Sequence, residues 1–178
     1  MSKIRDISCA PSGARKIDWV KSCMPVLSAI ETRFAAERPL AGLRVSMSIH
    51  LEAKTAYLAM VLARGGAEIS VTGCNPLSTQ DDVAAALAAD GYNVFAWHGA
   101  TDAEYTSHLT DTLAASPHII IDDGGDLVNL LHADAGSYAA NIIGGCEETT
   151  TGVHRLRARA QAGELAFPML AVNDANCK

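Results

Sequence analysis

The chain has 178 residues, 49% of them hydrophobic and 19% charged, which suits a globular protein of one domain or slightly more. The formal net charge is −6 and no run of Lys and Arg forms a basic stripe, so nucleic acid is not an expected partner. No stretch reaches the roughly 18 apolar residues of a membrane span, and the first residues lack an apolar signal core. We therefore expect a cytoplasmic protein with no membrane partner.

The cysteine pattern argues against a disulfide framework or a zinc ribbon. The five cysteines form no C-x-x-C pair, and their number is odd: Cys9, Cys23, Cys74, Cys146 and Cys177. We expect reduced thiols and no metal site.

The N-terminal region, residues 1–42, is expected to be an arm and helices that pack on the following domain. Its first dozen residues show no period and predict a loose arm. Apolar residues then recur every three or four positions from about 14 to 36, which predicts a helix with a kink or a new start at Pro25. Pro39 and Gly42 end it.

From residue 43 to 178 the pattern alternates between strands and helices. Strands are predicted at 43–49, 68–72, 94–97, 118–121, from about 142, and at 169–172. Helices are predicted at 52–63, from about 81 to 90, and at 101–115, 126–131 and 151–162. This alternation indicates right-handed βαβ units and an α/β fold, a doubly wound, Rossmann-like parallel sheet. Ligands bind such sheets at the carboxyl ends of the strands.

Polar residues gather where the predicted strands end. His50 follows the first strand, an Asp-Asp-Gly-Gly-Asp run (122–126) follows the fourth, and Glu147-Glu148 precede three threonines. Each has a structural alternative: a hydrogen-bonded histidine, a turn with a helix cap, or adjacent carboxylates with one inward and one solvated. The glycines of 122–126 do not form G-x-G-x-x-G.

Three other histidines, at positions 98, 108 and 118, are expected at the surface or at strand edges.

Taken in order, several runs resemble adenosylhomocysteinase over nearly the whole chain. They are Cys-Asn-Pro-Leu-Ser-Thr-Gln-Asp (74–81), Phe-Ala-Trp (95–97), Asp-Asp-Gly-Gly-Asp-Leu (122–127), Glu-Glu-Thr-Thr-Thr-Gly-Val-His (147–154) and Val-Asn-Asp (172–174), with Met24-Pro25 and Arg-Pro-Leu (38–40) before them. The resemblance implies reversible, NAD-dependent cleavage of S-adenosylhomocysteine to adenosine and homocysteine, within one-carbon metabolism, by a homo-oligomeric enzyme.

The resemblance also implies roles for particular residues. His50 and Asp123 would exchange protons at the 5′ side, whereas Glu148 and Lys178 would hold the ribose hydroxyls, with Lys178 helping to remove the 3′ hydroxyl proton. The substrate-binding set would be Glu52, Lys54, Thr55 and Gln80, with Gln80 at the base. Three hydroxyls, of Thr149, Thr150 and Thr151, would reach NAD.

The sequence departs from the family pattern in two places. The family continues beyond the position of Lys178 with an Asp-Asn pair and a Rossmann domain, so we expect NAD to be held mainly by that domain and the 178 residues alone to be inactive. Two alternatives are a non-catalytic nucleoside-binding module and a partner domain of a full-length homologue.

The second departure concerns the purine. The family pattern after the histidine is Thr, any residue, then Glu or Gln, and here those positions are Glu52 and Lys54. A lysine has donors only, so it suits a 6-keto group better than a 6-amino group. This predicts S-inosylhomocysteine and inosine as substrate and product beside the adenosyl forms.

Overall fold

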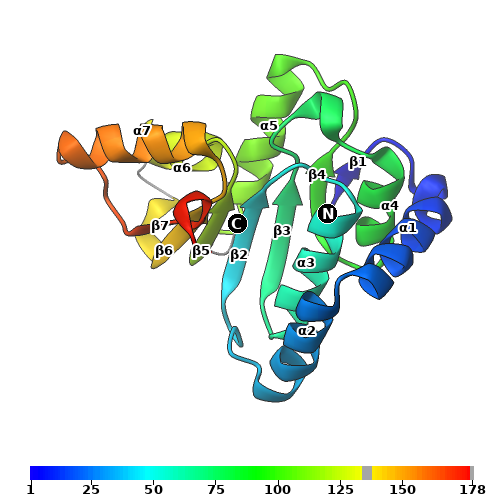
Figure 1. Cartoon of the computed structure of the whole chain (residues 1–178). Coiled ribbons are helices and arrows are strands. Elements are labelled where there is room, and N and C mark those ends of the chain that lie inside the picture. Colours follow the sequence, from blue (N-terminus) through cyan, green and yellow to red (C-terminus); the bar gives the residue numbers. More distant parts are fainter. Residues whose placement is uncertain (134–137, 177–178) are drawn as a thin grey trace.

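The computed structural model describes residues 1–133 and 138–176, which form an α/β fold around one parallel sheet (Figure 1). Its strands are β1 Lys3–Ile4, β2 Arg44–Ser48, β3 Glu68–Thr72, β4 Asn93–Ala96, β5 Ile119–Asp122, β6 Gly144–Glu147 and β7 Met169–Ala171. Within these ranges the order is β1-β4-β3-β2-β5-β6-β7, and all neighbours are parallel. The predicted fold class is confirmed.

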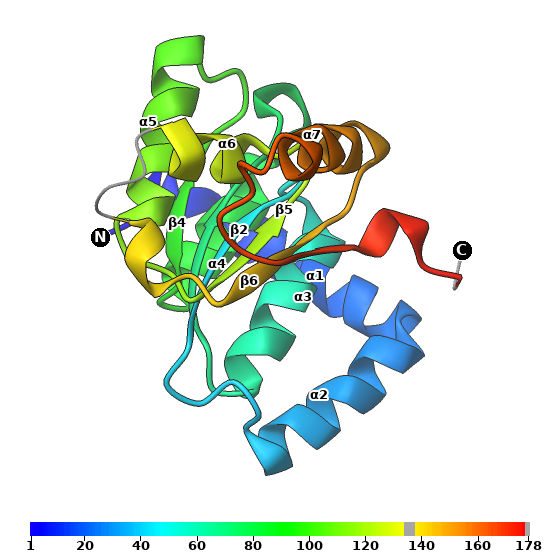
Figure 2. The same ribbon diagram turned by 90° about the vertical axis from the view of Figure 1, so that its left-hand side faces the viewer.

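Helices cover both faces of the sheet. Their bounds are α1 Ala10–Cys23, α2 Pro25–Glu37, α3 Ala53–Arg64, α4 Asp81–Ala89, α5 Asp102–Leu113, α6 Asp126–Ala133 and α7 Thr150–Gln161. The first four lie on one side, and α5, α6 and α7 lie on the other (Figure 2). None of the described helices combines the length and the apolar character that a membrane crossing needs.

The core has two parts, one on each face. Under α1, α3 and α4 the first part includes Met47 and Val71, both fully buried. The second lies beneath α5, α6 and α7 and includes Ile120 and Leu127. A strand covered on both faces tends to be almost continuously apolar, as β5 is before Asp122, which is why this strand could be predicted from composition.

The N-terminal arm was predicted to be loose, and this prediction is wrong. Lys3–Ile4 adds an edge strand beside β4, and Ser2 Oγ donates to the carbonyl of Tyr92 at 2.8 Å. Two residues paired through their backbone leave no periodic pattern, so the sequence carried no signal for this strand. The helical stripe is two helices, with α2 beginning at Pro25. A domain boundary at residue 42 stays a prediction.

The order of the strands creates a switch point at the centre of the sheet. From β2 the chain proceeds outward through β3 to β4, then returns to place β5 against the other side of β2. The loops after β2 and β5 therefore leave the sheet in opposite directions. A crevice between them is where open α/β sheets bind ligands.

Candidate active site

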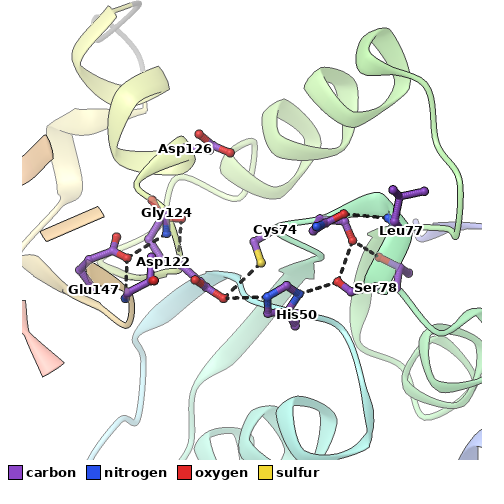
Figure 3. A network of polar contacts seen from close by, with 12 residues as sticks. His50, Cys74, Leu77, Ser78, Asp122, Gly124, Asp126 and Glu147 are labelled. Carbon is purple, nitrogen blue, oxygen red and sulfur yellow. Dashed lines mark hydrogen bonds and ion pairs between the residues drawn. The ribbon is translucent and has the colours of Figure 1, made fainter. Parts of the chain in front are cut away.

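Three side chains meet at this switch point, each just beyond the end of a strand. His50 follows β2, Cys74 follows β3 and Asp123 follows β5. The Cys74 thiol donates to Asp123 Oδ2 at 3.2 Å, and His50 Nε2 lies 3.7 Å from the same oxygen. Figure 3 shows this chain of contacts continuing through His50 to Ser78. The structure thus brings the predicted pair His50 and Asp123 together.

The imidazole of His50 is held between two polar partners. Its Nδ1 is in hydrogen-bond contact with Ser78 Oγ, which also lies 3.0 Å from the carbonyl oxygen of Asn75. Its Nε2 faces Asp123 Oδ2. An imidazole can take up or give a proton at its ring nitrogens, and the exposed edge of this ring is open to a ligand.

The Cys74 thiol is held in its protonated form. Burial raises its pKa, and the hydrogen bond and negative charge of Asp123 raise it further. Sequence reasoning left Cys74 among the ordinary reduced thiols, and only the folded loops bring it to the carboxylate. Together with His50 and Asp123 it offers ligand types that transition metals bind.

Beneath the exposed cluster lies Asp122, whose side chain is fully buried. Its carboxyl accepts from the backbone N–H of Asp123 at 3.1 Å and of Val128 at 3.0 Å. Burial raises the pKa of Asp122 to about 7, the two backbone hydrogen bonds oppose this, and the nearby charge of Glu147 adds to it. Asp122 therefore holds the loop that carries Asp123 rather than facing a ligand.

Glu147 is a second fully buried carboxyl, paired in register with Asp122 on the neighbouring strand. Its Oε1 accepts from the N–H of Gly124 at 2.9 Å and of Thr149 at 3.0 Å (Figure 3). Burial raises the pKa of Glu147 as well. One oxygen thus joins the loop of Asp123 to the turn that carries Glu148. Sequence reasoning assigned Glu147 no role.

The four predicted substrate-binding residues all line one or the other of two hollows. One, of about 810 Å³, is lined by Glu52, Lys54 and Gln80 together with parts of α1. The other, of about 620 Å³, is lined by Lys54, Thr55 and Glu148 together with apolar residues of α2 and α3. Lys54 borders both hollows. Neither hollow is lined by His50 or Asp123, so a single cleft joining Glu148 to this pair stays a prediction.

Among the polar side chains that line these hollows, Glu52 and Gln80 have partners and Lys54 has no ion-pair partner in the described chain. Glu52 caps α3 by accepting from the N–H of Thr55 at 3.3 Å, and Lys16 donates to Gln80 Oε1 at 3.1 Å. The exposed Lys54 makes no ion pair with any residue in the described ranges. Its ammonium group is therefore available to a ligand, and pairing with Glu52, the simplest structural role, is not seen.

The remaining predicted residues are at the start of α7 and at the C-terminus. Thr150 and Thr151 are exposed in the first turn, and the side chain of the N-cap residue Thr149 caps no backbone N–H. Lys178 lies outside the described residues. The expectation for the surface histidines is wrong for His108, which is 2% exposed and packs edge-on against Trp97 with ring centres 4.0 Å apart.

Comparison with known proteins identifies the family of the chain. The family model of S-adenosyl-L-homocysteine hydrolase matches residues 1–139 and 135–178. The S-inosyl-L-homocysteine hydrolase of Methanocaldococcus jannaschii is 54% identical over 178 residues, all of this chain and 43% of the relative. That of Methanopyrus kandleri is 52% identical over 98% of this chain and 41% of its own length.

The adenosylhomocysteinase of Pyrococcus abyssi is 48% identical over 98% of the chain and 42% of its own length. The chain thus spans less than half the length of these curated relatives. Matches along its whole length, at about half identity, are decisive for the family. The chain belongs to the S-adenosyl-L-homocysteine hydrolase family.

Proposed function

We propose that the chain is the substrate-binding part of an NAD-dependent hydrolase that cleaves S-inosyl- or S-adenosyl-L-homocysteine to a nucleoside and L-homocysteine. The observation that carries the proposal is the position of His50 Nε2, which faces Asp123 Oδ2 at 3.7 Å at the switch point of the sheet. An imidazole beside a carboxylate is suited to receive a proton and pass it on. The names of the similar relatives supply the reaction class.

Cleavage at the ribose 5′ carbon needs an acid for the departing sulfur and a base for the water that replaces it. His50 and Asp123 would give a proton to the departing homocysteine sulfur and take one from the water that replaces it. Glu148, on the neighbouring strand end, would hold the ribose hydroxyls. NAD, when bound, supplies a reversible hydride acceptor for the ribose 3′ carbon, which acidifies the 4′ position.

The start of α7 fits a dinucleotide. The Thr149 side chain caps no backbone N–H, and Thr150 and Thr151 expose their hydroxyls in the first helical turn. The N-terminus of a helix also favours the negative charge of a phosphate. These three hydroxyls would touch the cofactor from the substrate side, with the remaining contacts made outside residues 1–176.

The base preference follows from Lys54, which borders both hollows and has no ion-pair partner in the described chain. Its ammonium offers three donors and no acceptor. A 6-keto purine accepts such a donor, whereas a 6-amino group faces it donor to donor. We therefore place the inosyl substrate ahead of the adenosyl substrate.

A chimaera tests the reaction. Residues 1–178 replace the matched region of the Methanocaldococcus jannaschii relative, and thiol release from both substrates is followed colorimetrically, with the intact relative as positive control. We expect turnover, and a loss of roughly 10²–10⁴-fold in His50→Ala, the range that general acid–base catalysis contributes. The exposed His154 on α7 gives the matched control, and His154→Ala should stay within about twofold of the parent.

A folded chimaera that binds inosine but releases no thiol would instead favour a non-catalytic nucleoside-binding module. The same chain, assayed alone with added NAD, is expected to be inactive. Turnover by the 178 residues alone, abolished by His50→Ala, would contradict the assignment of the cofactor contacts to a further domain.

A further inference from the structure

The cluster at the switch point has the composition and spacing of a metal site. His50, Cys74 and Asp123 each offer one ligand atom, and these atoms all lie within 4.8 Å of one another. The sulfur and the carboxylate oxygen are 3.2 Å apart, and the oxygen and Nε2 are 3.7 Å apart. Zinc bonds of about 2.0–2.3 Å in a tetrahedron put ligand atoms roughly 3.3–3.8 Å apart. Two of the three separations therefore already approximate edges of such a tetrahedron.

The histidine is oriented in the way that metal ligands are. A ligating imidazole normally donates its other N–H to a fixed acceptor, which sets the tautomer and the ring direction. Here Nδ1 contacts Ser78 Oγ, which also lies within hydrogen-bond distance of the Asn75 carbonyl. Nε2 is thereby turned toward Asp123. Because Ser78 already holds the ring in this direction, binding requires little reorganisation of the ring.

The ligand types select a thiophilic cation over a hard one. A thiolate and a carboxylate together carry two negative charges, which balance the two positive charges of a divalent cation. The imidazole binds as a neutral ligand. Mg²⁺ and Ca²⁺ prefer oxygen ligands, and this cluster has a single carboxylate, whereas Zn²⁺ binds N, S and O donors. His50 is exposed, so the fourth position of a tetrahedron can be filled by water or by an added thiolate.

We propose that His50, Cys74 and Asp123 bind one Zn²⁺ ion, with Ser78 as the residue that orients the histidine. As the Zn–S bond forms, the Cys74 thiol loses its proton to solvent, and no electrons are transferred. If the proposed function holds, this ion would occupy the groups needed for proton transfer and would act as an inhibitor. The binding itself does not depend on that function.

Titration of the metal-free, tag-free chain with Zn²⁺ tests the site by calorimetry. We expect one ion per chain, with affinity lowered at least tenfold in Cys74→Ser and in His50→Gln. Ser78→Ala removes the contact that orients His50 and should lower affinity about tenfold. Cys23→Ser, which removes an exposed thiol, is the matched control and should change affinity less than twofold. Circular dichroism checks that each variant is folded. Because His50 is exposed, His50→Gln should fold and can decide the test even if Cys74→Ser does not fold.

Co²⁺ provides a readout specific to the sulfur. In a background whose other four cysteines are replaced by alanine or serine, a thiolate-to-cobalt charge-transfer band can come only from Cys74. The band should appear with one equivalent of Co²⁺ and vanish on addition of Zn²⁺. Zn²⁺ affinity within twofold of wild type in a folded His50→Gln chain, absence of the band, or equal affinity for Mg²⁺ would each overturn the proposal.

Discussion

Two pairs of adjacent acidic residues end neighbouring strands, and each pair divides its side chains in the same way. Asp122 and Glu147 are fully buried, side by side in register on β5 and β6. Their sequence neighbours Asp123 and Glu148 instead point to the cluster with His50 and to the hollow beside α2 and α3. Alternation along a strand accounts for the division, because successive side chains leave opposite faces.

The comparison shows how a parallel sheet builds a site from short segments. The inner carboxyls use backbone N–H groups as their partners: Asp122 accepts from Asp123 and Val128, and Glu147 accepts from Gly124 and Thr149. They thereby fix loops that have no regular hydrogen bonds of their own. The outer carboxyls hold no backbone N–H within the described chain: Asp123 faces Cys74 and His50, and Glu148 is exposed. Identical residue types thus have a structural role at one position and a ligand-facing role at the next.

The largest effect that this division predicts is on stability, at Glu147. Glu147→Ala removes the carboxyl oxygen that accepts from two backbone N–H groups, and each such group costs roughly 1–3 kcal/mol when left unpaired in the interior. We expect the free energy of unfolding to fall by this amount for each amide that water does not reach. Urea unfolding of the chain measures it. Glu147→Gln keeps an oxygen acceptor and should recover most of the loss.

The outer neighbour is the matched control for this experiment. Glu148→Ala removes an exposed carboxylate whose side chain accepts no bond within the described chain, so its free energy of unfolding should change by less than about 0.5 kcal/mol. Equal losses at positions 147 and 148 would contradict the division into inner and outer carboxyls.

A slightly smaller effect is expected at Gly152, in the first turn of α7. A Cβ built at this position lies 2.1 Å from the Glu147 carboxyl carbon, so an alanine would displace the buried side chain. Gly152→Ala should cost about 1–3 kcal/mol, as overpacked interiors typically do. Thr151→Ala, one residue earlier and exposed, gains helix propensity and should not lower stability. A Gly152→Ala chain as stable as Thr151→Ala would remove the case for tight packing here.

Much of this arrangement could be read from the sequence, because strand composition and strand ends are local signals. The run of apolar residues before Asp122 predicted a buried strand, and the polar run after it predicted a position at the sheet edge. The expectation that one of the two adjacent carboxylates points inward and the other to solvent is also confirmed, because Glu147 is buried and Glu148 is exposed. The resemblance added reaction roles for His50 and Asp123, which the structure places in contact.

The parts that could not be predicted depend on contacts between distant segments. Cys74 and Asp123 are 49 residues apart, and only the order of the strands makes their loops neighbours. The strand Lys3–Ile4 pairs with β4 through backbone atoms alone. His108 was expected at a surface, but its position on α5 places it against Trp97. The sequence did not decide between these positions, because a histidine is compatible with either the buried or the exposed face of a helix.

A specificity effect of intermediate size is expected at Lys54, an outward-facing residue with no ion-pair partner in the described chain. In the chimaera, Lys54→Glu replaces a donor with an acceptor, so kcat/KM should shift toward the adenosyl substrate by about tenfold or more, which is ~1.4 kcal/mol. Lys21→Glu, on α1 and outside both hollows, is the matched charge change. A substrate ratio that moves equally in both variants would assign the effect to net charge instead of the base.

The smallest effect concerns a third buried polar residue, His108, whose Nε2 has no hydrogen-bond partner among residues 1–133 and 138–176. Burial lowers the pKa of His108, the charges of Asp111 and Glu104 oppose the shift, and Lys3 adds to it. Below the usual histidine pKa of about 6.5 the unfolded chain binds a proton that the folded chain does not, so this residue lowers stability as pH falls through that value.

His108→Phe keeps an aromatic ring against Trp97 and cannot titrate. The free energy of unfolding of this variant, relative to wild type, should therefore rise between pH 8 and pH 5, while the contributions of Asp122 and Glu147 are common to both chains and cancel. A difference that is independent of pH would mean that His108 is protonated equally in the folded and unfolded states, and would remove it from the set of buried groups that titrate on unfolding.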